Sequence, residues 1–121
     1  MLEAEFQAQV RQLCTIRGLL VYHTHDSRRS DAGFPDLTIV GSKRMLFREL
    51  KKEDGRVSPM QQYWIDRLND VGQDAGVWRP SDMPRIVREL GTLGAITIPT
   101  PTDVAAAKKK AAAGMRGGSR R

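Results

Sequence analysis

The sequence predicts an α/β fold in which a small mixed β-sheet is flanked by helices. Apolar residues recur at helical spacing in segments near the start, in the middle and towards the end of the chain, and runs rich in strand-forming residues lie between these segments. The expected order is helix, three strands, helix, strand, helix, which favours strands of mixed direction. At 121 residues the chain is long enough for one domain with a modest core.

The first helix is predicted over residues 3–17. Its apolar positions follow helical spacing, and Gly18 is a typical residue to end it. The apolar stripe comprises Leu2, Phe6, Val10, Leu13 and Cys14. The next segment, LLVYH at residues 19–23, is rich in strand formers, whereas residues 24–35 are polar, contain glycine and proline, and indicate a loop.

Residues 36–41 and 44–51 are predicted to form an antiparallel hairpin with Ser42-Lys43 at its tip. In that register Val40 lies opposite Met45, and Thr38 lies opposite Phe47. The same register places Asp36 opposite Glu49, and strand alternation puts Lys51 on the face that carries Glu49. The hairpin therefore brings two carboxylates and one ammonium group together.

A second helix is predicted over residues 58–71. Ser58 suits the N-cap, Pro59 the first helical position and Gln61 the third, which together form a capping box. Gly72 ends this helix, and DAGVW at residues 74–78 predicts a short strand. Either Ser81 or Asp82 is expected to cap a last helix that runs to about residue 90.

The charge of the chain is unevenly distributed. Residues 108–121 hold six of its 20 basic residues and no acid, which leaves 14 basic against 14 acidic residues elsewhere. We therefore expect a domain over residues 1–97 and a flexible basic tail over residues 98–121, with Lys108, Lys109 and Lys110 contacting nucleic acid. A tail that only aids solubility, or that derives from cloning, is the alternative.

The composition also indicates in which cellular compartment the protein is found. A single cysteine, Cys14, rules out an internal disulfide bond and fits a reducing compartment. The chain opens on acidic residues where a signal peptide carries positive charge, and no apolar run approaches the roughly 18 residues that span a membrane. We expect a soluble intracellular protein that does not contact membranes.

Two carboxylates held side by side on a strand pair need a compensating cation or a shared proton. Their oxygen atoms suit Mg²⁺, with Mn²⁺ as a substitute, and the carbonyl of Leu50 is a plausible third protein ligand beside Asp36 and Glu49. Such an ion activates water and polarises a phosphate, while Lys51 neutralises developing charge. The structural alternative is an ordinary ion pair between Glu49 and Lys51.

The stretches GFPD, FRELK, SPMQQYWIDRL and WRPSD, taken in order, resemble the VRR-NUC domain over about residues 3–90. This family is a compact branch of the PD-(D/E)xK nucleases, which have a restriction-endonuclease-like core. The resemblance implies a metal-dependent phosphodiesterase that acts on DNA. It implies catalytic roles for Asp36, Glu49, Lys51 and Gln61, and for a glutamate on the first helix, for which Glu5 is preferred over Glu3.

The resemblance also implies a biological setting. Related nucleases act on branched or structured DNA in replication, recombination or repair, including phage enzymes that cut Holliday junctions, and leave 5′-phosphate and 3′-hydroxyl ends. The analogy implies a homodimer, a possible helicase or other replication or repair partner, and a location in the cytoplasm of a bacterium or of a phage-infected host. The alternatives are a non-catalytic nucleic-acid-binding module with a nuclease-like fold, or an interaction protein.

Other polar and aromatic residues have two interpretations each. His23 and His25 have the spacing of metal ligands but no third soft ligand nearby, so a loop at the mouth of the site is favoured over a zinc site. In that loop Ser27, Arg28 and Arg29 are expected to contact phosphates. The two tryptophans are expected in the core, with stacking on unpaired bases as the alternative. They are Trp64 and Trp78.

Overall fold

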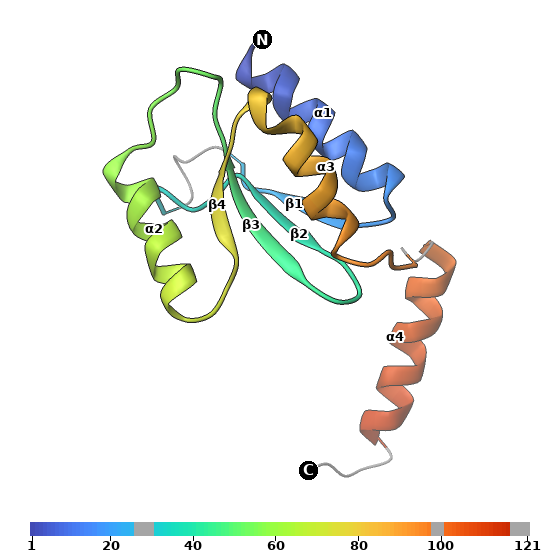
Figure 1. Ribbon diagram of the computed structural model, residues 1–121. Coiled ribbons are helices and arrows are strands. Elements are labelled where there is room, and N and C mark those ends of the chain that lie inside the picture. The colour runs from blue at the N-terminus through green and yellow to red at the C-terminus, as the bar shows by residue number, and fades with distance from the viewer. Residues whose placement is uncertain (26–30, 98–100, 117–121) are drawn as a thin grey trace.

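The computed structural model describes residues 1–25, 31–97 and 101–116, and its elements follow the predicted order (Figure 1). Four strands form one sheet in the order β1-β2-β3-β4. The pairs β1/β2 and β2/β3 are antiparallel, whereas β3/β4 is parallel, so the predicted mixed sheet is confirmed. The strands are β1 (Leu20–His23), β2 (Leu37–Val40), β3 (Met45–Leu50) and β4 (Ala75–Trp78).

The hairpin of β2 and β3 has the predicted register. Val40 pairs with Met45 and Thr38 pairs with Phe47, and the regular ladder ends where Leu37 pairs with Arg48. The parallel pair β3/β4 needs a crossover connection, which the helix α2 (Pro59–Asp70) provides. The carboxyl end of β3 lies close to the start of α2, and four of the five predicted catalytic residues fall in this region.

Helices cover both faces of the sheet. The helices α1 (Glu3–Ile16) and α3 (Met83–Gly91) lie on one face, and α2 lies on the other (Figure 1). Strand alternation turns the buried apolar side chains of β2 and β3 towards α1 and α3, where they form the core. The core residues are Phe6, Val10, Cys14, Leu19, Leu37, Ile39, Leu46, Leu50, Trp78, Ile86, Leu90 and Leu93.

The helix ends confirm most of the predicted signals and correct one. Gly18 has a φ of 70° directly after α1, and Ser58 caps α2 in a capping box with Gln61. The start of α3 differs from the prediction: a short 3₁₀ helix, η1 (Pro80–Asp82), precedes it, and the Asp82 side chain makes no cap bond to α3. Its carboxylate instead accepts a hydrogen bond from the Arg79 N–H at 2.8 Å.

The basic segment differs from the expected flexible tail. Residues Pro101–Arg116 form the helix α4 (Figure 1), whereas residues 98–100 and 117–121 lie outside the described residues. Alanine and lysine, which dominate this segment, are among the strongest helix formers, and proline is favoured in the first helical turn. Low apolar content suggested a lack of structure, but the local helix propensity is high. Among the described residues, no helix is long and apolar enough to cross a membrane.

Candidate nuclease active site

A polar cavity of about 420 Å³ lies where the carboxyl end of β3 meets the first turn of α2. The entry to β2 and the end of β1 complete its wall. Four of the five residues predicted to be catalytic line this cavity. Its lining comprises Glu3, His23, Thr24, His25, Asp31, Gly33, Phe34, Asp36, Glu49, Lys51 and Gln61.

Asp36 lies one residue before β2, and its side chain continues the strand pairing beyond the regular ladder. One of its carboxylate oxygens, Oδ2, accepts a hydrogen bond from the Leu50 N–H at 2.9 Å. Its own carbonyl oxygen accepts from the Thr24 N–H at 2.8 Å. The Leu50 N–H therefore holds this carboxylate at the end of β3, beside Glu49, while the Thr24 N–H fixes the main chain of Asp36.

Glu49 is the most deeply buried charged residue of the cavity lining. Its residue surface is only 3% exposed, although strand alternation turns it away from the main core and towards α2. Oε2 accepts a hydrogen bond from Gln61 Nε2 at 2.9 Å and lies 3.5 Å from Lys51 Nζ. Oε1 is buried without a hydrogen-bond partner. Burial, and then the negative charge of Asp36, raise the pKa of Glu49 to about 8, against the opposing effect of Lys51.

Gln61 links the cap of α2 to this carboxylate. The Gln61 N–H donates to Ser58 Oγ at 3.1 Å, and Gln61 Oε1 accepts from the Ser58 N–H at 2.8 Å. The other end of the same amide, Nε2, donates to Glu49. One glutamine side chain therefore completes the capping box of α2 and also orients Glu49.

The glutamates of α1 are placed differently from the preferred assignment. Glu5 was favoured as the site residue, but its Oε1 accepts from the Leu2 N–H at 2.9 Å and completes the cap of α1. Glu3 lines the cavity instead. A glutamate at the third position of a helix reaches back to the N-cap, so the local capping signal competes with a role in the cavity.

The donor set fits a divalent cation of the magnesium type. Across residues 1–25, 31–97 and 101–116, no three Asp, Glu, His or Cys side chains gather into a group that would enclose a metal. A Mg²⁺ ion, however, usually binds one or two carboxylates and keeps several waters. The unpartnered Oε1 of Glu49, buried beside the Asp36 carboxylate, is the kind of oxygen that such an ion satisfies.

The remaining predicted binding residues fall into two groups. Ser27, Arg28 and Arg29 lie outside the described residues. The predicted DNA-contacting lysines of the basic segment are exposed on α4 and do not line the cavity. They are Lys108, Lys109 and Lys110.

Several cavity residues had weak or no signals in the sequence. His23 and His25 were expected at the mouth of the site and do line it, with ring centroids 5.1 Å apart. Thr24, Asp31 and Phe34 were not singled out. They belong to the polar stretch before β2, and no motif in the sequence shows which of its side chains turn inward.

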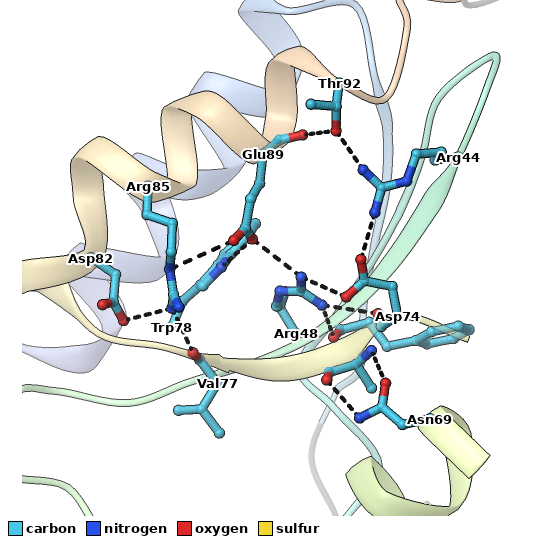
Figure 2. A network of polar contacts seen from close by, with 12 residues as sticks. Arg44, Arg48, Asn69, Asp74, Val77, Trp78, Asp82, Arg85, Glu89 and Thr92 are labelled. Carbon is cyan, nitrogen blue, oxygen red and sulfur yellow. Dashed lines mark hydrogen bonds and ion pairs between the residues drawn. The ribbon is translucent and has the colours of Figure 1, made fainter. Parts of the chain in front are cut away.

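Arg48 was also missed, and it supports the strand that carries Glu49. It points to the opposite face, where its side chain is 7% exposed and lies between Asp74 and Glu89 (Figure 2). The guanidinium donates to Asp74 Oδ1 at 2.8 Å and to Glu89 Oε1 at 3.2 Å, and it lies 5.1 Å from the Trp78 ring centroid. Arg44 also binds Asp74, so this network fixes β3 against β4 and α3. The only signal for Arg48 in the sequence is that strand alternation places it on the same face as Leu46 and Leu50, which are apolar.

The fold and the cavity together define the class of protein. A mixed four-stranded sheet with flanking helices carries an aspartate, a glutamate and a lysine at the ends of β2 and β3, which is the arrangement of a small α/β nuclease-like domain. The family model described as the VRR-NUC domain matches residues 3–82, more than half of the chain. The chain therefore belongs to the VRR-NUC domain family, a nuclease family.

Solved structures support the fold. A structure described as a VRR_NUC domain protein is similar with a TM-score of 0.58 and 22% sequence identity, over 78% of this chain and 92% of that one. A second, described as a VRR_NUC domain, has a TM-score of 0.56 and 24% identity, over 75% and 91% of the two chains. No curated protein matches the sequence.

Proposed function

We propose that this chain is a divalent-metal-dependent endodeoxyribonuclease that hydrolyses phosphodiester bonds in branched or structured DNA. One observation carries the proposal: Glu49 Oε1 is buried without a partner next to the carboxylate of Asp36. Two carboxylates in that position repel each other, and the lysine nearby supplies only one positive charge. A divalent cation resolves both problems, and many nucleases use one to hydrolyse phosphodiester bonds.

The residues of the cavity have different roles in this proposal. Asp36, Glu49 and the Leu50 carbonyl would hold Mg²⁺, or Mn²⁺ in its place, which would supply an activated water and positive charge at the scissile phosphate. Lys51 has a side chain that is only 14% exposed, so its ammonium group acts in a partly dehydrated environment. It neutralises charge that builds up at the phosphate.

Gln61 has a positioning role in this proposal. Its Nε2 donates a hydrogen bond to Oε2 of Glu49, which leaves the unpartnered Oε1 available to bind the metal. Because the same amide is fixed by Ser58 at the start of α2, the orientation of Glu49 depends on a well-formed helix terminus.

The proposed partner is DNA, bound by a homodimer. The chain has a net charge of +6, and the exposed lysines of α4 carry part of that excess. Positive charge that lies away from the cavity binds phosphates without reading sequence, which suits an enzyme that recognises the shape of DNA. A dimer provides two cavities, which symmetric cutting of a four-way junction requires.

The experiment that tests this proposal is cleavage of labelled DNA of several shapes. Linear duplex, single strand, nicked duplex, flap and four-way junction are each incubated with Mg²⁺, Mn²⁺, Ca²⁺ or EDTA. We expect cutting with Mg²⁺ and Mn²⁺ and none with EDTA. We expect Asp36→Asn and Glu49→Gln, which keep the shape of each side chain, to reduce the rate by at least about 100-fold, and Lys51→Ala to do the same.

The variants also provide the control. Asp36→Asn and Lys51→Ala retain the fold and the exposed basic residues, so we expect them to bind the junction about as tightly as the wild type in Ca²⁺. Binding without cutting, in every metal and on every DNA, would instead support a non-catalytic nucleic-acid-binding module. A Glu49→Gln variant that cuts at the wild-type rate would overturn the site assignment.

A further inference from the structure

A second, smaller hollow lies directly beside the catalytic cavity. It has a volume of about 260 Å³ and is lined by Tyr22, Thr24, Asp31, Phe34 and Trp64. Thr24, Asp31 and Phe34 also line the catalytic cavity, so the two hollows share a wall. A DNA strand with a phosphate in the cavity would therefore bring an adjacent nucleotide to the smaller hollow.

Two aromatic rings of this hollow are fixed by their own contacts. Trp64 Nε1 donates a hydrogen bond to the Ala32 carbonyl at 3.1 Å. Phe34 packs edge-on against Trp64, with centroids 5.1 Å apart, and edge-on against Phe47 at 6.0 Å. The predicted core position of Trp64 is thus only partly realised, because it is half-buried and borders an open hollow.

The third ring, Tyr22, is exposed. It lies on β1, an edge strand, and 63% of its surface is accessible although the hollow borders it. A single exposed tyrosine needs no functional explanation. Here, however, it stands with two fixed aromatic rings at the border of a site for phosphodiester chemistry, where an aromatic face can receive a base.

We propose that this hollow binds the base of an unpaired nucleotide next to the phosphate that is cut. The proposal rests on the proposed nuclease function and specifies its substrate. The rings of Tyr22, Phe34 and Trp64 offer stacking surfaces, while the Asp31 carboxylate can accept hydrogen bonds from base amino groups. An aromatic lining with one hydrogen-bond acceptor therefore fits a base.

The base must leave the duplex to enter this hollow. Inside a double helix both faces of a base are covered by its neighbours, so a side chain stacks on it only if it is unpaired or flipped out. We therefore expect the preferred substrate to have an unpaired nucleotide at the cut, as at a flap, a frayed end or the exchange point of a junction, and intact duplex to be cut poorly.

Binding without catalysis provides the first test. In EDTA, a short single-stranded oligodeoxynucleotide and its duplex are titrated while tryptophan fluorescence is recorded. Trp78 is fully buried on the other face, so Trp64 reports on the hollow. We expect the single strand to change the fluorescence of the wild type but not of Trp64→Phe, and Tyr22→Ala to weaken single-strand binding about fivefold or more.

Matched variants separate stacking from damage to the fold. Tyr22→Phe keeps the ring and should bind like the wild type. Because Tyr22 is exposed, Tyr22→Ala should retain the wild-type melting temperature. Equal binding of single strand by Tyr22→Ala and the wild type, with unchanged tryptophan fluorescence, would overturn the proposal.

Cleavage distinguishes failure of this proposal from failure of the nuclease function. A flap with an abasic residue beside the cut is compared with the intact flap, in Mg²⁺. We expect the abasic substrate to raise KM for the wild type, with little further effect for Tyr22→Ala. Cutting that responds to neither change would overturn the base site and leave the nuclease intact. No cutting, together with Tyr22-dependent binding in EDTA, would support the base site and reject the nuclease.

Discussion

At the scale of single residues, Glu49 combines features that ordinary packing does not require. It is a carboxylate that is only 3% exposed, it lies beside Asp36, and one of its oxygens lacks a partner. In a protein without metal such a group favours its protonated form, because burial and a like charge both disfavour ionisation. The same two effects increase its affinity for a cation that replaces the proton.

The raised pKa of Glu49 predicts how stability depends on pH without metal. The pKa rises from 4.5 to about 8 on folding, so between these values the folded chain binds more protons than the unfolded chain. Stability from this group is therefore complete below about pH 4.5 and is lost as the pH rises towards about 8. We expect the melting temperature in EDTA to fall more steeply from pH 5 to pH 8 for the wild type than for Glu49→Gln. Parallel profiles of the two proteins would contradict the assignment.

At the scale of elements, the cavity depends on close contact between the loop before β2 and the start of α2. Gly33 has a φ of 96°, and a Cβ built on it would lie 2.7 Å from the main-chain carbon of Met60. Only glycine fits such a contact at positive φ. Asp36 follows in the same loop and Gln61 follows Met60, so this contact helps to position both.

Gly33→Ala and Gly72→Ala form a matched pair that tests this contact. Gly72 also has positive φ, at 88°, but a Cβ there meets nothing within 4 Å. We expect Gly72→Ala to lose about 1 kcal/mol in the free energy of unfolding, and Gly33→Ala to lose about 2 kcal/mol more from the clash. Urea unfolding measures both, and only Gly33→Ala should also reduce cleavage. Equal effects of the two substitutions would show that the contact is unimportant.

The network around Arg48 gives a second prediction at this scale. Arg48→Met removes a buried guanidinium from Asp74, Glu89 and the Trp78 ring (Figure 2), and we expect a loss of about 2 kcal/mol in the free energy of unfolding. Arg44→Met is the control. Arg44 also binds Asp74, but its side chain is 45% exposed, so we expect a loss of less than about 1 kcal/mol. Similar losses for both variants, measured by urea unfolding, would contradict the importance of burial.

At the scale of the whole molecule, the cavity and the cluster of exposed lysines belong to different parts of the chain. The core and the cavity are built from residues between Glu3 and Leu93, whereas the cluster of exposed lysines lies on α4. Long-range attraction to DNA depends on total charge, while the cavity depends on local geometry. Removal of the basic segment should therefore change affinity and leave the chemistry unchanged.

Truncation after residue 97 tests this separation. It removes the six basic residues of the segment 108–121, and each phosphate contact contributes about 0.9 to the slope of log affinity against log salt concentration. We expect the slope to fall by up to about 5, and by roughly 3 when only Lys108, Lys109 and Lys110 are replaced by glutamine. The cleavage rate of bound DNA and the melting temperature should be unchanged. An unaltered salt slope would exclude a role for α4 in binding DNA.

The sequence by itself determined the features that local chemistry decides. The alternation of apolar and polar residues, the turn at Ser42-Lys43 and the capping box of α2 predicted the elements and the register of the hairpin, and so the proximity of Asp36 to Glu49. Apolar content does not predict the helix α4, because this segment has little surface to bury, and its helix propensity is what favours the observed structure.

Only the tertiary structure decided which residues of other segments reach the same cavity. It places Glu3, and not Glu5, in the lining of the cavity, turns Asp31 and Phe34 towards that cavity, and places Arg48 against α3 on the opposite face. These choices depend on the rotation of a helix about its axis, on the path of a loop, and on contacts between segments far apart in the chain. Periodicity and spacing along the sequence do not encode them, because each is set by packing against a partner that the local pattern does not specify.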